Sequence, residues 1–435
     1  MTEFRWMAPI LVGFTTRPGA SVRAPEECAQ MWGRIATRAG TNKGSEGWGF
    51  PRQGGSEPVL GWSLAAGEVM PRPLEAILGH ADPTTLPASD LLFPTEATWA
   101  LYDHGVLLME GLLQTQPDAT PTPQDAQMWE SEVQRLGTAI AQEIATGVME
   151  QLVGLIDAEE EADDYFVVAA EEIGLPVWVT RALVVDPDVP GHDDFARAWV
   201  GGIDADHRVQ CERLLAGDQS LVAQWMNHLH RRDRAEDVEE SWSALRRAQF
   251  FWTALQGIDE RLRLILARAM GPDDEISLAE LQSELQETVD AAQEVLMLKA
   301  EVLQHASRRS IREMLRFLDF WDYQLVLEDP VREKVENCKS RLTALAEERS
   351  ARSAMFTDIL LMCIGVTSIL ATAIALVQFG RSAVVDPDQS KFDFGAGAIT
   401  SWISAQPMDV VLVLSLLTSI VLVLVFVWKR RQTLS

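Results

Sequence analysis

The chain has 435 residues, a formal net charge of −27, four cysteines and 47% hydrophobic residues. At roughly 100–200 residues per domain, this length predicts two or three structural units. The acidic balance argues against nucleic acid as a partner, because phosphates bind surfaces rich in lysine and arginine. The cysteines are far apart and form no CxxC pair, which favours a reducing compartment over a disulfide framework.

The first 115 residues mix short strand-like runs with loops rich in glycine and proline. The best strand candidates are MAPILVGF, PVLGWSLAAG and TWALYDHGVLLMEGLL, at residues 7–14, 58–67 and 98–113. The last run breaks at Asp103-His104-Gly105, which is typical of a hairpin turn. The glycine-rich stretch at 40–58 lacks the GxxxxGK[ST] pattern, so we expect no phosphate-binding loop there.

A proline-punctuated connector at 116–125 leads into a helical pattern from Ala126 to Ile156. The run LPVWVTRALVVD, residues 175–186, then reads as another buried strand. Because strands and helices interleave, we expect residues 1–235 to form a cytoplasmic α/β or α+β domain.

The pattern becomes purely helical in the stalk region, residues 236–356. A long helix is predicted from Val238 to Met270, and a second one follows the capping box that runs from Ser277 to Glu280 and continues to about residue 327. A third helix begins after Pro330 and meets no further proline or glycine before residue 365. This last helix is therefore expected to continue directly into the apolar run that follows it.

Two apolar runs, at 357–379 and 408–428, are each long enough to span a hydrocarbon core of roughly 30 Å. They predict two transmembrane helices, joined by an extracytoplasmic loop at 380–407 and followed by a basic tail at 429–435. Arginine and lysine gather before the first run and after the second. The positive-inside rule then places both termini in the cytoplasm, at a bacterial inner (cytoplasmic) membrane.

This order of elements resembles the CorA family of divalent-cation transporters, the two-span GxN superfamily, over roughly residues 90 to 431. The resemblance implies a homopentamer whose first span lines a central pore. The family's Gly-Met-Asn signature is missing, because this chain reads Val377-Gln378-Phe379-Gly380-Arg381 at that place, and its outer loop is longer. The resemblance therefore implies the architecture of the family but not its selectivity for magnesium. Similar CorA-like proteins also act as membrane effectors in bacterial defence.

One heptad stripe of the first run is mostly polar or small, and we predict that it lines a pore. The stripe consists of Asp358, Leu361, Gly365, Ser368, Thr372, Ala375 and Phe379. Close packing of helices, with hydroxyls bonded back to their own backbone, explains the same stripe equally well. Gln378 and Arg381 would lie at the outer mouth, where an inward-pointing arginine would repel cations.

Three further groups are candidate sites, each with an ordinary alternative. A carboxylate run that could sense a divalent cation such as Mg²⁺ could equally be a solvated helix end. A basic cluster could ring the cytoplasmic mouth or simply contact anionic lipid. His228 and His230 lie in a stretch that reads as helical and rich in arginine, and with Cys211 upstream they could bind zinc or be incidental. The carboxylate run is Asp157, Glu159, Glu160, Glu161, Asp163 and Asp164, and the basic cluster is Lys429, Arg430 and Arg431.

No catalytic motif is present in the sequence, so we expect neither an enzyme nor a required cofactor. The main prediction is an oligomeric CorA-like inner-membrane ion channel or transporter, gated by its cytoplasmic domain. The alternatives are a ligand- or partner-activated membrane effector of a defence or signalling system, and a non-conducting membrane-anchored scaffold that binds through residues 1–235. Expected partners are membrane lipid, further copies of the chain in a homopentamer, and an activating ligand or protein.

Overall fold

The computed structural model divides the chain into two compact units, residues 1–342 and 343–435. It describes residues 1–17, a few residues between 27 and 49, and residues 76–385 apart from 103–104, 160, 202–204, 224–225, 271–276 and 306–307. Scattered residues between 402 and 421 are also described. The fold below is given for the first unit, followed by what is described of the second.

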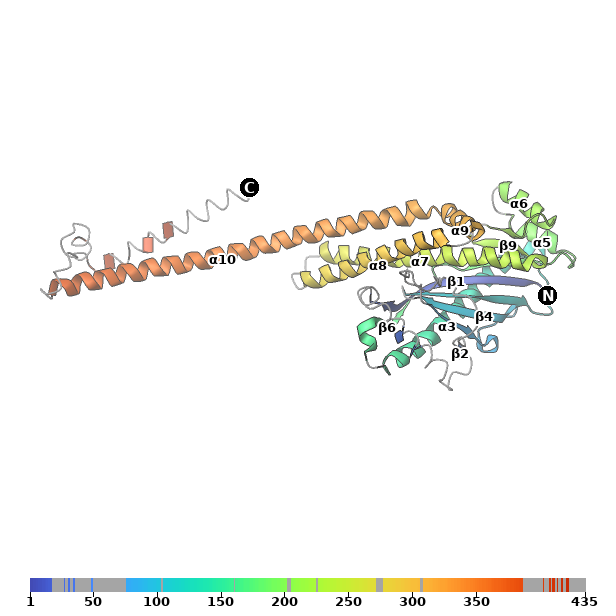
Figure 1. Ribbon diagram of the computed structural model, residues 1–435, viewed down its shortest axis with the longest axis horizontal. Coiled ribbons are helices and arrows are strands. Elements are labelled where there is room, and N and C mark those ends of the chain that lie inside the picture. The colour runs from blue at the N-terminus through green and yellow to red at the C-terminus, as the bar shows by residue number, and fades with distance from the viewer. Residues whose placement is uncertain are drawn as a thin grey trace, which may run out of the picture. The chain divides into compact units, whose positions relative to one another are not determined.

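The first unit is built on one mixed sheet with the strand order β2-β3-β4-β5-β1-β7-β9-β8 (Figure 1). β6 lies off this path and pairs with the second half of β1. The neighbours pair antiparallel except for β7 and β9, which are parallel. The bounds are β1 Glu3–Thr16, β2 Trp48–Gly49, β3 Ala76–Ala81, β4 Leu92–Tyr102, β5 Val106–Thr115, β6 Phe166–Ile173, β7 Thr180–Val185, β8 Leu221–Val222 and β9 Asn227–Arg231.

The central strand β1 changes partner along its length. Residues 3–7 pair with β7, and residues 12–16 pair with β6. Pro9 falls in the interval between these two partners, where its carbonyl accepts a hydrogen bond of 2.9 Å from the backbone of Val177. Since proline has no N–H to donate, this interval is where a central strand can accommodate it.

One face of the sheet packs against α3 (Ala126–Ile156), as Figure 1 shows. Alternate β1 side chains point to this face, because successive residues of a strand face opposite sides. Phe4 stacks on Trp129 of α3 with ring centroids 6.0 Å apart, and it lies 5.3 Å from the ring of Trp199. The short α4 (Ala162–Tyr165) follows α3, while α5 (His192–Trp199) and α6 (Ala205–Leu215) lie between β7 and β8 in the chain.

The other face packs against α7 (Ala235–Met270), which α8 (Leu278–His305) and α9 (Arg308–Phe320) accompany (Figure 1). Trp242 and Gln249 of α7 are fully buried against the strands. A π-helical turn, Gln324–Glu328, leads into α10 (Asp329–Val385). Three short 3-10 helices complete the described elements, at Pro83–Thr85, Pro123–Asp125 and Arg232–Arg234.

Several predicted elements are confirmed and others are corrected. The helix predicted at 126–156 is α3, and the predicted hairpin is formed by β4 and β5. The second predicted long helix is wrong, because α8 ends at His305 and a separate helix and a π-turn follow. The strand predicted at 58–67 lies outside the described residues.

The prediction of two C-terminal transmembrane helices is also corrected. Among the residues that the structure describes, no helix combines the length and the apolar character that crossing a membrane requires. This finding contradicts the fold with spans at 357–379 and 408–428, and the membrane protein and ion channel that depended on them. The first run is part of α10, where Thr367, Ser368 and Thr372 are described beside Leu361 and Ile364, so the described surface is mixed. Most of the second run lies outside the described residues.

Candidate functional site

A cavity of about 340 Å³ opens in the first unit where the two parallel strands end. β7 and β9 both run towards it, and Val184, His230 and Arg231 near their carboxyl ends form part of its wall. Ligands of α/β proteins commonly bind at the carboxyl ends of parallel strands. We call this cavity the ionic pocket. Its charged lining residues are Glu3, Arg5, Glu96, Glu110, Arg231, Arg232 and Glu239.

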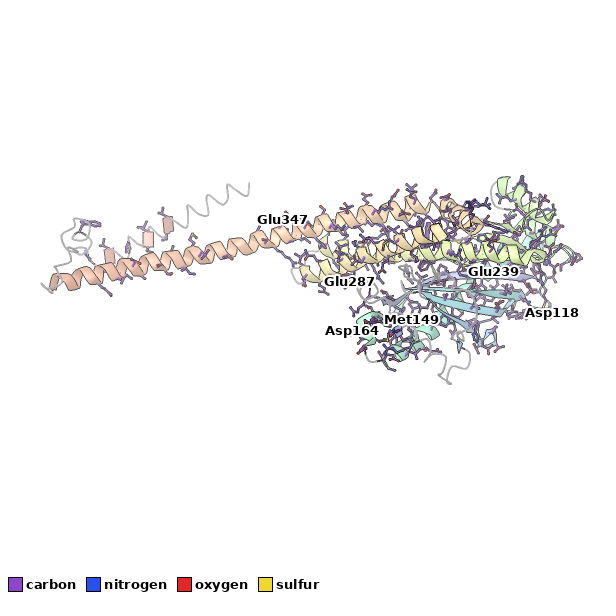
Figure 2. The ribbon with its side chains drawn as sticks, viewed as in Figure 1. Asp118, Met149, Asp164, Glu239, Glu287 and Glu347 are labelled. Carbon is purple, nitrogen blue, oxygen red and sulfur yellow. The ribbon has the colours of Figure 1, made fainter. Side chains whose placement is uncertain are left out.

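The ionic pocket lies on the side of the sheet that faces α7. Arg5 projects from β1 to this side and pairs with Glu239 of α7 at 2.7 Å, whereas the neighbouring Phe4 packs against α3. This follows from the alternation of side chains along a strand. Figure 2 labels Glu239 on α7, with Asp164 and Met149 toward the opposite end of the unit.

A network of charges and one indole holds the α7 wall in place. The Arg5 guanidinium lies 4.7 Å from the centre of the Trp242 ring, a cation–π geometry. Trp242 Nε1 donates to Glu110 Oε2 at 2.7 Å. Arg246 pairs with the other oxygen of Glu110 and, at 3.5 Å, with Glu239. Burial opposes the charge of Arg246, but the neighbouring Glu110, Tyr102 and Glu239 together raise its pKa.

The opposite wall is held by the residues that follow the parallel strands. Arg232 bridges Glu3 at 2.7 Å and Asp186 at 3.3 Å. Arg231 donates to both carboxylate oxygens of Asp233 and to the last carbonyls of α6, so each of its nitrogens is occupied. Its hydrogen bonds to Asp233 raise the pKa of Arg231 and lower that of Asp233.

Carboxylates outnumber guanidinium groups in this network. The four arginines Arg5, Arg231, Arg232 and Arg246 face six carboxylates, so the formal balance of the set is −2. The carboxylates are Glu3, Glu96, Glu110, Asp186, Asp233 and Glu239. Glu96 on β4 is exposed and forms no ion pair with any residue that the structure describes. Of the two surplus negative charges, one is therefore at Glu96, and the other belongs to Glu3 and Asp186, which share Arg232.

His230 forms a second polar feature of the ionic pocket. It is only 2% exposed, and its Nε2 has no hydrogen-bond partner within the described part of the chain. Its ring packs edge-on against Trp242 with centroids 4.8 Å apart. Burial, with smaller contributions from Arg5 and His228, lowers the pKa of His230 well below its usual value. The imidazole is thus neutral at physiological pH and offers an unused polar nitrogen.

A second cavity, of about 350 Å³, lies at the other end of β1 between the strands and the helices α7 and α8. Its wall combines glycines with apolar side chains such as Leu11 and Ile258, and it carries charges only from Glu260, Arg261 and Glu294. A β-bulge between Val12 and Gly13 shapes this end of the strand. The cavity has less polar recognition chemistry than the ionic pocket, which makes the ionic pocket the stronger candidate site.

The structure does not gather the predicted pore stripe into the ionic pocket. Leu361, Gly365, Ser368, Thr372 and Ala375 lie exposed on α10 within the second unit, as does Gln378. The Thr372 hydroxyl donates to the carbonyl of Ser368 at 2.8 Å, which is the backbone bonding expected of the packing alternative. The side chains of Asp358, Phe379 and Arg381 and the whole of Lys429, Arg430 and Arg431 lie outside the described residues.

The carboxylate run extends from the turn after α3 into α4, which contains Asp163 and Asp164. Glu161 has a left-handed backbone with φ of 77°, and Asp157, Asp163 and Asp164 are exposed. Glu159 pairs with Arg34 at 3.9 Å, and Glu160 is outside the described residues. No group of three or more potential metal ligands occurs among the described residues. The run as a cation sensor therefore stays a prediction.

The predicted zinc group is separated by the fold. His228 and His230 lie on the strand β9, not on a helix, and both pack against Trp242. Cys211 of α6 is buried with Leu229 in the core on the opposite face of that strand. Burial raises the pKa of the Cys211 thiol to about 11, which keeps it protonated.

Sequence reasoning missed the ionic pocket as a site. Its members come from β1, β4, β5, β7, β9, α7 and the 3-10 helix Arg232–Arg234, and no two of its key carboxylates are close in the chain. The available signal was the alternation in Asn227-His228-Leu229-His230-Arg231, which is the period of a strand. No family model, curated protein or solved structure matches the chain. The resemblance to CorA-like proteins and the homopentamer consequently stay predictions.

Proposed function

We propose that this chain is a ligand-responsive effector, in which a small molecule bound in the ionic pocket alters the start of α10 through α7. This proposal corresponds to the ligand-activated effector that the sequence indicated as an alternative to a channel, but it does not depend on membrane spans. The observation that carries the proposal is that α7 contributes at one end to the pocket and at the other end to the packing of α10.

The pocket end of α7 supplies Glu239, Trp242 and Arg246 to the ionic network. A ligand that pairs with any of these groups competes with their present partners. Because the network joins α7 to β1 and β5, such competition changes how the helix is held on the sheet. Ligand binding therefore has a direct route to the position of α7.

The far end of α7 holds the first turns of α10 through three contacts. Lys334 forms an ion pair with Asp259, which is only 7% exposed. Cys338 Sγ donates to the carbonyl of Leu262 at 3.6 Å, and Arg341 Nε donates to the carbonyl of Ala269 at 3.3 Å. A helix of 36 residues is about 54 Å long at 1.5 Å per residue, so one rigid element connects both ends.

The test is a thermal-denaturation screen of the full chain against organic cations, nucleotides, amino acids and carboxylates. A ligand that binds only the native state raises the midpoint of unfolding. Thr98→Trp, which fills the ionic pocket from β4, should abolish the shift, while Thr146→Trp on the exposed face of α3 should not. If no compound gives a shift that Thr98→Trp removes, the proposal fails.

A further inference from the structure

We propose that the ligand of the ionic pocket is a linear organic polycation of the polyamine class. This inference rests on the proposed function, since it names the chemistry of the ligand for the same site. It is carried by the charge balance of the pocket, by two polar groups that have no partner among the described residues, and by the placement of these groups across the sheet.

The charge balance selects a cationic ligand. Every arginine of the network is already paired with a carboxylate, and Arg231 has no free nitrogen. Among the residues that the structure describes, Glu96 is the carboxylate of this set without an ion pair, and the formal balance of the whole set is −2. An anion would have to displace a carboxylate from its arginine, whereas a cation meets a carboxylate that is already available. A ligand with two or more positive charges neutralises the surplus.

A buried neutral histidine provides the second, independent observation. His230 is 98% removed from solvent, lines the pocket, and has no partner for Nε2 among the described residues. Buried polar groups without a partner are uncommon, because each one costs free energy. In the neutral tautomer that carries its proton on Nδ1, Nε2 can accept a hydrogen bond from an ammonium group. A cationic N–H donor satisfies His230 and Glu96 with the same chemistry.

The placement of these groups requires an elongated ligand. Glu96 is on β4 and His230 is on β9, with β5, β1 and β7 between them in the sheet. At about 4.8 Å between neighbouring strands, these two strands lie roughly 19 Å apart. Glu110 and Glu239 lie along the way, on β5 and α7. A flexible chain with ammonium groups at intervals can meet several of these acceptors at once, as a compact cation cannot.

A single metal ion fits the pocket less well. No cluster of three or more His, Cys, Asp or Glu suited to a metal is found among the described residues. The cavity volume of about 340 Å³ also corresponds to a small organic molecule more than to an ion. Mg²⁺ therefore serves as the competing cation in the test.

The experiment is isothermal titration of the full chain with spermidine, repeated with Mg²⁺ and with citrate. We expect one spermidine site per chain, with no comparable binding of Mg²⁺ or citrate. Glu96→Gln should weaken that site by about tenfold, whereas Glu143→Gln, which removes an exposed carboxylate of α3, should leave it unchanged. His230→Leu, checked for folding by circular dichroism, should weaken it in addition.

Four results would overturn the inference. Many weak sites that persist in Glu96→Gln would show attraction to the acidic surface in general. Tighter binding of Mg²⁺ than of spermidine at the same site would identify a metal site. Binding of citrate or a nucleotide that Thr98→Trp abolishes, without spermidine binding, would reject the polycation and leave the proposed function standing. Absence of any ligand that depends on the pocket would reject both.

Discussion

Acidification is expected to destabilise the first unit because β9 buries two neutral histidines. Burial, with a smaller effect of Arg181, lowers the pKa of His228 to about 3, and the pKa of His230 is also well below its usual value. In the unfolded chain both side chains return to a pKa near 6.5. Between these values the unfolded state binds more protons than the native state, so stability falls as the pH falls.

The magnitude follows from the same pKa difference. At pH 5 an unfolded histidine gains about 2 kcal/mol from protonation that the buried native side chain does not gain. His228 alone therefore costs about 2 kcal/mol between pH 7.5 and pH 5, and His230 adds a loss of the same sign, against a typical stability of about 5–15 kcal/mol. Carboxylates add little in this interval, because their ordinary pKa values lie near 4.

The assay is urea unfolding followed by tryptophan fluorescence at pH 7.5 and pH 5. The variant His228→Leu/His230→Leu should lose at least about 2 kcal/mol less than the natural chain over this interval, whatever its stability at pH 7.5. His80→Gln removes an exposed histidine of β3 and serves as the control that keeps the natural response. Equal losses in the natural chain and the double variant would refute the reasoning.

Two further predictions concern stability at neutral pH. Arg181 is 5% exposed and donates to Asn227, Gln134 and Glu130, so Arg181→Met should cost about 2–3 kcal/mol of unfolding free energy. The substitution Arg135→Met, at an exposed position, should change the unfolding free energy by less than about 0.5 kcal/mol. Equal effects of the two substitutions in urea unfolding would contradict this prediction. A Cβ at Gly111 would overlap the carbonyl oxygen of Glu96, so Gly111→Ala should lower the unfolding free energy by about 1–3 kcal/mol. Nothing lies within 4 Å of a Cβ at Gly154 in α3, so Gly154→Ala should raise the unfolding free energy by about 0.5–1 kcal/mol. An unfolding free energy of Gly111→Ala equal to that of the natural chain would contradict the predicted overlap with Glu96.

The local elements of the first unit could be predicted from the sequence because their signals are local. The period of residues 126–156 gives a helix, and the turn at Gly105 separates two runs of alternating side chains. His228 and His230 were predicted to lie in a helical stretch, because β9 has only five residues and arginines directly follow its histidines. The apolar runs at 357–379 and 408–428 likewise predicted two transmembrane helices, whereas no described helix has both the length and the apolar character that such a span requires.

The ionic pocket could not be predicted because it depends on the order of strands in the sheet. Glu3 and Glu239 come from opposite ends of the unit's sequence, and they meet only when β1 lies beside β5 and β7 and α7 covers that face. Nothing in the sequence around Glu96 indicates that it would be the carboxylate without an ion pair to any described residue. Such a site follows from topology, which the sequence pattern left undetermined.

The most direct test of the account is hydrogen exchange of the full chain with and without saturating spermidine. We expect slower exchange at residues 235–246 of α7, which border the pocket, and a change in exchange at residues 331–342 of α10. Asp259→Asn, which breaks the ion pair with Lys334, should preserve the first effect and reduce the second. A response confined to the pocket, with α10 unaffected in the natural chain, would contradict a ligand-responsive effector.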